Sequence, residues 1–221
     1  MTDKNPQKIK EMFDNISSYY DKMNDYMSFF THKNIKKSSI KMLDIKPDAL
    51  ILDLCCGTGD LCGIISSLYP KAKVIGLDFS REMIKLAKQK YPQITFINDD
   101  CTNLPFENEF DFVTIGFGLR NIENRELAIS QIYKSLKSGG KFLHLDFGKH
   151  NKISKIFDKI VPVWVKLLKK EAQSYEYLLQ SKNTYPEPDK LIEEFENAGL
   201  KFARKKDFLF GAISAQVMKK P

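Results

Sequence analysis

The first sixty residues change their hydrophobic pattern part-way, from a helical spacing to a strand-like run. Near the N-terminus, apolar residues recur at spacings of three and four, at Ile9, Met12, Phe13 and Ile16. This spacing predicts a helix from Pro6 to Ile16, and a second helix is expected from Asn34 to Leu43. From residue 49 the pattern becomes a continuous apolar run, which is typical of a strand buried on both faces.

Beyond this point, strand-like and helix-like patterns alternate. Apolar runs typical of buried strands occur at Ala49–Leu54, Lys73–Asp78, Ile94–Ile97, Phe110–Ile115 and Phe142–Phe147. Helix-like segments lie between them, at Leu61–Leu68, after Ser80 and at Asn124–Leu136. Ser80 is expected to cap the middle helix, and Gly139-Gly140 is expected to end the last one. This alternation predicts an α/β fold, a parallel sheet with helices on both faces.

The C-terminal third interrupts the alternation. The segment from Lys149 to Glu187 has no strand pattern, and we interpret residues 149–187 as a helical insertion, or lid, over the sheet. A helix is expected from Lys190 to Ala198, followed by an antiparallel closing hairpin that turns near Gly211. Because no repeat or linker is present, residues 1–221 are interpreted as one domain, with residues 1–45 as a helical substrate cover.

Composition then narrows the class of protein. The 221 residues are 43% hydrophobic and 29% charged, which is typical of a soluble globular protein and excludes a disordered or coiled-coil chain. The N-terminus has no apolar signal-peptide core, and no run is long enough to span a bilayer. The four cysteines have neither the spacing of a zinc site nor a disulfide framework, so we expect no metal and a reducing, cytoplasmic location.

The net charge of +7 predicts an anionic partner: nucleic acid, lipid or ligand. Seven lysines and one acidic residue lie between Lys149 and Lys170, around the apolar run Ile160–Leu168, which holds the single tryptophan, Trp164. This arrangement favours a lid over an apolar substrate, with peripheral contact to an anionic membrane at its inner face. A core-packing helix with solvated lysines is the alternative. No basic patch interleaved with aromatic residues occurs, so nucleic acid is disfavoured.

The strongest chemical signal is a glycine turn after the first strand, Asp53-Leu54-Cys55-Cys56-Gly57-Thr58-Gly59-Asp60. Glycines at this position let the backbone approach a ligand at the carboxyl edge of the sheet. A dinucleotide would place its pyrophosphate at the helix N-terminus, where Asp60 repels it. S-adenosylmethionine carries positive charge and no phosphate, so the acidic turn favours it. Asp78 and Asp100, after the next two strands, are placed to meet its ribose and adenine.

The whole chain also resembles the ubiquinone/menaquinone biosynthesis C-methyltransferase family. The resemblance rests on motifs spread over nearly its full length: Tyr20-Asp21-Lys22-Met23-Asn24, Met27-Ser28, His32, Leu52-Asp53-Leu54, Gly57-Thr58-Gly59-Asp60-Leu61, Gly76-Leu77-Asp78, Leu104-Pro105-Phe106, Phe117-Gly118-Leu119-Arg120-Asn121 and Ser174-Tyr175-Glu176-Tyr177-Leu178. The chain departs from the family pattern at Cys55, where glycine is common, at Ile35, where tryptophan is common, and at Asp146, where glutamate is common.

The resemblance implies a Rossmann-like class I methyltransferase that moves a methyl group from S-adenosylmethionine to a ring carbon of a prenylated quinol. Demethylmenaquinol is the favoured substrate; a 2-polyprenyl-6-methoxy-1,4-benzoquinol of ubiquinone biosynthesis, or another small molecule, is the alternative. The candidate cofactor-binding residues are Asp53, Gly57, Thr58, Gly59, Asp60, Asp78, Asp100, Cys101 and Gly116.

Candidate catalytic residues come from the N-terminal cover and from the fourth strand's end. Arg120 is expected to hold a phenolate or a water, which Asn121 orients, and His32 is a candidate base because its reference pKa is near 6.5. Tyr20 and Asn24 are expected to close over the substrate ring, and Trp164 to contact the substrate. The oligomeric state is not predicted.

Overall fold

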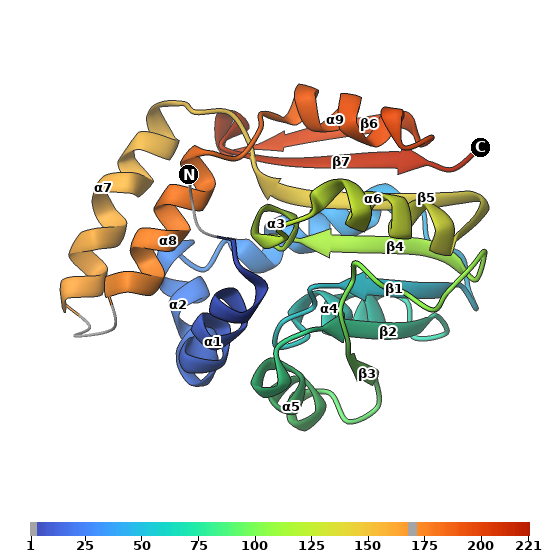
Figure 1. The fold of residues 1–221 in the computed structure, drawn as a ribbon, viewed down its shortest axis with the longest axis horizontal. Coiled ribbons are helices and arrows are strands. Elements are labelled where there is room, and N and C mark those ends of the chain that lie inside the picture. The colour runs from blue at the N-terminus through green and yellow to red at the C-terminus, as the bar shows by residue number, and fades with distance from the viewer. Residues whose placement is uncertain (1–3, 168–171) are drawn as a thin grey trace.

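A seven-stranded sheet forms the centre of the computed structural model, which describes residues 4–167 and 172–221 (Figure 1). Its strands are β1 (Leu50–Leu54), β2 (Lys73–Asp78), β3 (Thr95–Asn98), β4 (Phe110–Gly116), β5 (Leu136–Phe147), β6 (Lys201–Phe208) and β7 (Ile213–Lys219). Their order is β3-β2-β1-β4-β5-β7-β6. The first five strands are parallel, and β7 runs antiparallel to both β5 and β6. This confirms the predicted fold class.

Side-chain alternation along the strands divides the core between the two faces of the sheet. On β1, Ile51 packs with one hydrophobic cluster, and Leu52 and Leu54 pack with the other. The first cluster includes residues of α3 (His32–Ile40), α4 (Asp60–Leu68) and α5 (Arg81–Lys90); the second includes residues of α6 (Arg125–Ser135) and α9 (Pro188–Asn197). Helices therefore cover both faces, as the alternation of patterns predicts.

The remaining helices gather beyond the carboxyl ends of the parallel strands. They are α1 (Pro6–Ile16), α2 (Tyr20–Met27), α7 (Lys152–Leu167) and α8 (Ala172–Asn183), with short helical turns η1 (Ser17–Tyr19), η3 (Leu119–Asn121) and η4 (Leu209–Gly211). A fourth turn, η2 (Lys41–Leu43), precedes β1 and packs in the core. Figure 1 shows α1, α2, α7 and α8 on the side to which the arrowhead of β4 points. Met23 of α2 packs against Phe157 of α7 and Leu179 of α8, so these helices form one cover.

The predicted elements differ from the structure mainly at one junction. The helix predicted to end at Gly139-Gly140 ends at Ser135, and both glycines lie inside β5. Leu136 already has an extended backbone, with φ −71° and ψ 140°, and it pairs with Phe110 of β4. The strand thus begins before the glycines, and Gly139 supplies a left-handed residue within it rather than a helix stop.

Other elements agree with the sequence more closely. The helix Pro6–Ile16 and the strand Lys73–Asp78 have the predicted bounds, and the Ser80 side chain accepts from the Met83 N–H as an N-cap. Among the described residues, no helix is long and apolar enough to cross a membrane.

Candidate functional site

Two cavities lie at the carboxyl edge of the sheet, where β1, β2 and β4 all end. Parallel strands deliver the residues that follow them to one edge, and ligands of open α/β sheets bind at that edge. We call the first the acidic cavity. Its lining includes four acidic residues and, among the described residues, no lysine or arginine: Asp78, Asp99, Asp100 and Glu123. This charge fits a cationic ligand and opposes a phosphate-bearing one.

Asp78 is the most firmly positioned carboxylate in the acidic cavity. Its Oδ2 accepts from the Gly57 N–H and its Oδ1 from the Ser80 N–H, both at 2.9 Å. Burial raises the pKa of Asp78 to about 6, because the backbone N–H groups of Ser80, Gly57 and Phe79 only partly offset the lost solvent. Each oxygen keeps a further lone pair, so the carboxylate is oriented to accept from the two hydroxyls of a ribose.

The acidic cavity contains five of the nine predicted cofactor-binding residues in its lining: Gly57, Asp78, Asp100, Cys101 and Gly116. Asp53 is not among the lining residues. It is buried, and its carboxylate accepts from Thr114 Oγ1 at 2.6 Å and from the Cys62 thiol at 3.2 Å. Side chains alternate along a strand, so Asp53 points to the face covered by α4 rather than to the open edge. Burial raises its pKa to about 6.

Thr58, Gly59 and Asp60 also lie outside the lining and instead connect the glycine turn to neighbouring helices. Thr58 Oγ1 donates to Asp21 of α2, and Lys90 Nζ donates to both Asp21 and Asp60. Gly59, at φ 82°, precedes α4 and packs closely against the ring of Phe96, which leaves no room for a Cβ. These residues hold the turn and the cover in place.

Several lining residues of the acidic cavity were not predicted. Phe79 and Met83 follow Asp78 and line the cavity, as do Ile9 and Phe13 of α1. Phe79 was recognisable from its position next to the predicted acidic residue. The α1 residues could not be recognised from the sequence. An apolar stripe on a helix does not indicate whether the stripe packs in the core or lines a cavity.

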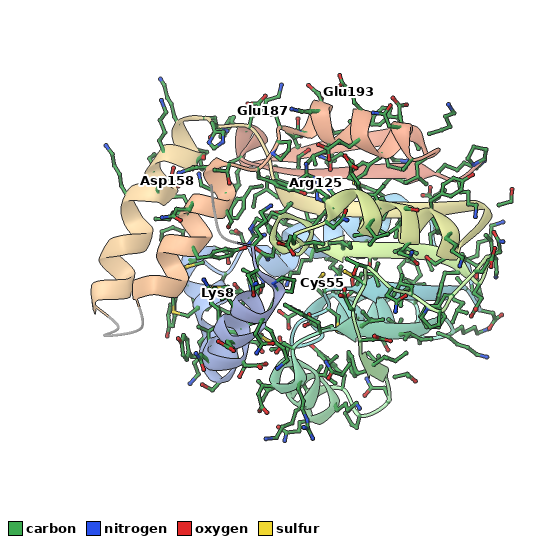
Figure 2. The ribbon with its side chains drawn as sticks, viewed as in Figure 1. Lys8, Cys55, Arg125, Asp158, Glu187 and Glu193 are labelled. Carbon is green, nitrogen blue, oxygen red and sulfur yellow. The ribbon has the colours of Figure 1, made fainter. Side chains whose placement is uncertain are left out.

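Cys55, labelled in Figure 2, also lines the acidic cavity. Its φ is 53°, a left-handed conformation that favours glycine, which explains why glycine is common at this position in the resembling family. Gly118 makes room for the Cys55 side chain. A Cβ at position 118 would lie only 2.4 Å from the Cβ of Cys55, so a larger residue would clash there.

The second cavity, which we call the apolar cavity, lies under the cover helices. Most of its lining is hydrophobic and comes from α1, α2, α7 and the chain around η4: Met12, Phe13, Ile16, Tyr19, Met23, Met27, Phe117, Phe147, Ile153, Phe157, Leu209, Ala212 and Ile213. Its basic lining residues are Lys36, Arg120, Lys182 and His32, and no Asp or Glu lines it among the described residues. Each of the three cations is ion-paired, Lys36 with Asp60, Arg120 with Asp146 and Lys182 with Asp158. The lining therefore fits a hydrophobic molecule with a polar group that meets these side chains.

The two cavities meet. Five residues line both of them: Phe13, Tyr20, Gly116, Phe117 and Asn121. Asn121 accepts from the Tyr177 hydroxyl at 3.2 Å, and Tyr20 hydrogen bonds with Asn24. Burial raises the pKa of Tyr20, so its hydroxyl stays protonated and acts as a donor. A group held in one cavity is therefore next to a group held in the other.

His32 lines the apolar cavity and is held by Asp25. Its Nε2 lies 2.8 Å from Asp25 Oδ1, and its Nδ1 is buried with no hydrogen-bond partner among the described residues. A carboxylate partner fixes the proton on Nε2, which leaves Nδ1 as an acceptor. Burial lowers the pKa of His32, with Lys36 contributing, so the ring is neutral at neutral pH. The structure thus contains an oriented neutral imidazole without a proton on Nδ1.

Arg120 lines the apolar cavity but is anchored by a buried ion pair. Its guanidinium donates to Asp146 Oδ1 at 2.9 Å and to the Phe117 carbonyl, and it stacks over the Phe147 ring at 5.1 Å. Both charged side chains are buried. Asp146, the shorter residue where the resembling family often has glutamate, is still long enough to reach the arginine.

Replacing Arg120 by alanine is expected to destabilise the fold by about 3–5 kcal/mol, because it leaves Asp146 buried without a counter-charge. Thermal unfolding measures this loss. The double variant Arg120→Ala/Asp146→Asn is expected to recover part of it. An unchanged melting temperature in the single variant would contradict a structural contribution from the pair.

Two predicted substrate contacts remain, Asn24 and Trp164. Asn24 lines the apolar cavity, as expected for a substrate contact. The side chains of Trp164 and of the apolar run Ile160–Leu168 lie outside the described residues.

Comparisons with known proteins identify the family of this chain. The model of the ubiE/COQ5 methyltransferase family matches residues 1–220. The chain belongs to this family. It is 35% identical over 228 residues to proteins named demethylmenaquinone methyltransferase from Bacillus cereus and Bacillus anthracis, covering 97% of this chain and 96% of each relative. This ubiE/COQ5 family protein is an S-adenosylmethionine-dependent methyltransferase.

Solved structures share the fold at low sequence identity. A methyltransferase bound to the Haloferax volcanii Trm112 activator superposes with a TM-score of 0.74 at 15% identity, covering 95% of this chain and 97% of that chain. A methyltransferase from Thermotoga maritima, a possible histamine N-methyltransferase, gives a TM-score of 0.72 at 17% identity, covering 96% and 100%. The ubiE/COQ5 family protein therefore has the class I methyltransferase fold.

Proposed function

We propose that this enzyme methylates a ring carbon of a prenylated quinol, with demethylmenaquinol as the favoured substrate. The observation that carries the proposal is the junction of an acidic cavity with an apolar one at Tyr20, Gly116 and Asn121. A cationic methyl donor fits the first cavity and a hydrophobic ring with a prenyl chain fits the second. The relatives named demethylmenaquinone methyltransferase support the naphthoquinol.

The acidic cavity is the proposed site of S-adenosylmethionine, which supplies an electrophilic methyl group when it is bound. Asp78 accepts from the ribose hydroxyls, and Asp100 and Cys101 lie where the adenine edge is expected. Four acidic side chains lie in the lining, in accord with the positive charge of the ligand. The other four predicted cofactor-binding residues lie outside the lining of the acidic cavity and stabilise the glycine turn: Asp53, Thr58, Gly59 and Asp60.

In the apolar cavity, the reaction requires a proton acceptor and stabilisation of a phenolate. A quinol ring carbon becomes nucleophilic as the adjacent hydroxyl loses its proton. His32 Nδ1 accepts that proton, since among the described residues that line this cavity it is a buried acceptor without a hydrogen-bond partner. Arg120, fixed by Asp146, stabilises the resulting anion through its positive charge. Tyr20 and Asn121 orient the ring at the junction of the cavities.

Direct methylation assays test the proposal. Purified enzyme with radiolabelled S-adenosylmethionine is offered demethylmenaquinol and, separately, a 2-polyprenyl-6-methoxy-1,4-benzoquinol, and the products are identified by mass spectrometry. Methylated naphthoquinol is the expected product. Methylation of the benzoquinol alone would shift the assignment to ubiquinone biosynthesis, and methylation of neither would contradict the proposal.

We place the reaction in the cytoplasm, at the inner face of the membrane, because a prenylated quinol resides in the bilayer. The lysines between Lys149 and Lys170 support peripheral contact with anionic lipid there. Trp164 stays a proposed substrate contact.

A further inference from the structure

Four large apolar side chains are exposed around the rim of the apolar cavity. Phe29, Phe30 and Phe210 are 63%, 62% and 93% exposed, and Ile156 of α7 is 53% exposed. Monomeric soluble proteins rarely display apolar side chains gathered in this way without a partner. The four residues belong to three segments that are far apart in sequence. Phe29 and Phe30 are adjacent, and Ile156 and Phe210 each lie in another segment.

These side chains are next to residues that line the apolar cavity. Ser28 and Thr31, on either side of the two phenylalanines, line it, as do Leu209 and Ala212 around Phe210. Ile153 and Phe157, on either side of Ile156 in α7, also line the apolar cavity.

Hydrogen bonds also connect the segments that contain these four residues. Asn151, just before α7, donates to the carbonyls of Leu209 and Phe210, at 3.3 and 2.8 Å. Lys206, near the end of β6, donates to Ser38 of α3 at 2.9 Å. The exposed residues therefore surround one rim.

Backbone conformation sets these residues apart from incidental surface hydrophobes. Phe29, Phe30, Leu209 and Phe210 have φ values of 48°, 60°, 51° and 56°. The left-handed region is unfavourable for side chains of this size, and such strain is concentrated at functional sites. Two pairs of consecutive strained apolar residues, in two loops at one rim, indicate that the loop tips are shaped to present them.

The surrounding charge identifies the kind of partner. The three segments 28–37, 149–159 and 204–211 contain ten lysines and arginines and two acidic residues; Lys36 is buried and pairs with Asp60, and the other nine basic side chains are not buried. Among the described residues, no ion pair involves Lys37, Lys152 or Lys155, which are all exposed. Exposed aromatic side chains within a basic surface are typical of proteins that dock on an anionic bilayer.

We propose that this surface, formed by Phe29, Phe30, Ile156 and Phe210 with the lysines around them, docks on an anionic lipid bilayer. The phenylalanines insert at the level of the headgroups and the lysines contact anionic lipid, which places the mouth of the apolar cavity against the membrane. A prenylated quinol then reaches the cavity without crossing water. The proposal deepens the proposed function and rests on it for the identity of the substrate, but not for the lipid contact.

Vesicle co-sedimentation tests the docking surface. Wild-type protein is expected to bind vesicles of equal parts phosphatidylcholine and phosphatidylglycerol, more weakly in high salt, and to bind pure phosphatidylcholine poorly. The variant Phe29→Asn/Phe30→Asn/Phe210→Asn should lose about tenfold or more of this binding, since three inserted rings are removed. Asparagine tolerates the left-handed conformation, so the variant keeps its fold.

A matched control and a second readout keep the outcomes distinct. Phe202→Asn removes another exposed phenylalanine, 45% exposed at the start of β6, and should leave vesicle binding unchanged. Equal binding by the triple variant, absence of binding by the wild type, or a dimer that the triple variant dissociates would overturn the proposal. Methylation of a water-soluble short-chain quinol without vesicles should be the same in wild type and triple variant. If neither methylates it, the proposed function fails while the vesicle result stands.

Discussion

Replacing Asp78 by alanine is expected to weaken S-adenosylmethionine binding by about a thousandfold. The variant loses both of the proposed charge-assisted hydrogen bonds to ribose hydroxyls, at about 1.5–3 kcal/mol each. The carboxylate is already oriented by the N–H groups of Gly57 and Ser80, so no ordering cost offsets them in the wild type. Isothermal titration calorimetry measures the change.

The matched control for this variant is Asp53→Asn. Both carboxyl groups come from adjacent strands of the sheet and have a pKa raised to about 6 by burial, but only Asp78 lines the acidic cavity. Asparagine can still accept from Thr114, so Asp53→Asn should keep its cofactor affinity. A large loss of affinity in the control, or a small one in Asp78→Ala, would contradict the placement of the ribose.

The raised pKa of Asp78 gives cofactor binding a specific pH dependence. In the proposed site the ionised carboxylate accepts from the ribose, so binding should favour the charged form, and affinity is expected to be constant above about pH 6. As pH falls through 6, Asp78 is protonated in the free enzyme and affinity weakens. The step near pH 6 should be absent in Asp78→Ala, when titrations are carried out from pH 5 to 8.

The sequence predicted the sheet and its edge well because both depend on local patterns. Apolar runs followed by turn residues define parallel strands, and parallel strands bring Gly57, Asp78 and Gly116 to one edge whatever the tertiary details. The pattern did not distinguish a carboxylate at the edge from one on a covered face. Asp53 and Asp78 look equivalent in sequence, yet the side-chain alternation of β1 turns Asp53 towards α4.

The apolar cavity was harder to predict because it is built from segments far apart in sequence. The stripe of α1 predicted the helix correctly, but its residues Ile9, Met12, Phe13 and Ile16 turn out to pack in the core or to line the cavities. Lys182 comes from the insertion, where no motif marked it, and it lines the cavity while paired with Asp158 at 2.8 Å. Figure 2 shows Asp158 on α7. Tertiary packing decides such contacts, and periodicity does not encode them.

His32 was a candidate base from its residue type alone, and the structure adds the reason to test it. Replacing His32 by glutamine is expected to lower the methylation rate constant by about a hundred- to ten-thousandfold, the range for loss of a positioned general base. Glutamine can still bond to Asp25 but cannot take up a proton at neutral pH. Cofactor affinity should be unchanged, since His32 is not part of the acidic cavity. His150→Gln, at an exposed histidine, is the matched control.

The pH profile and the Asp25→Asn variant separate a proton acceptor from a packing residue. Burial lowers the pKa of His32 below 6.5, so the neutral, accepting ring is present at and above that pH and is lost as the pH falls through its folded-state pKa. At saturating S-adenosylmethionine, which removes the effect of Asp78 on cofactor affinity, the wild-type kcat/KM for the quinol should therefore be level around neutrality and decline on the acid side, and this decline should vanish in His32→Gln. Asp25→Asn removes the charge that holds the proton on Nε2, so it should lower kcat about tenfold or more while the ring remains in place. A merely structural histidine predicts lower thermal stability with an unchanged pH profile, which is the result that would contradict its role as the base.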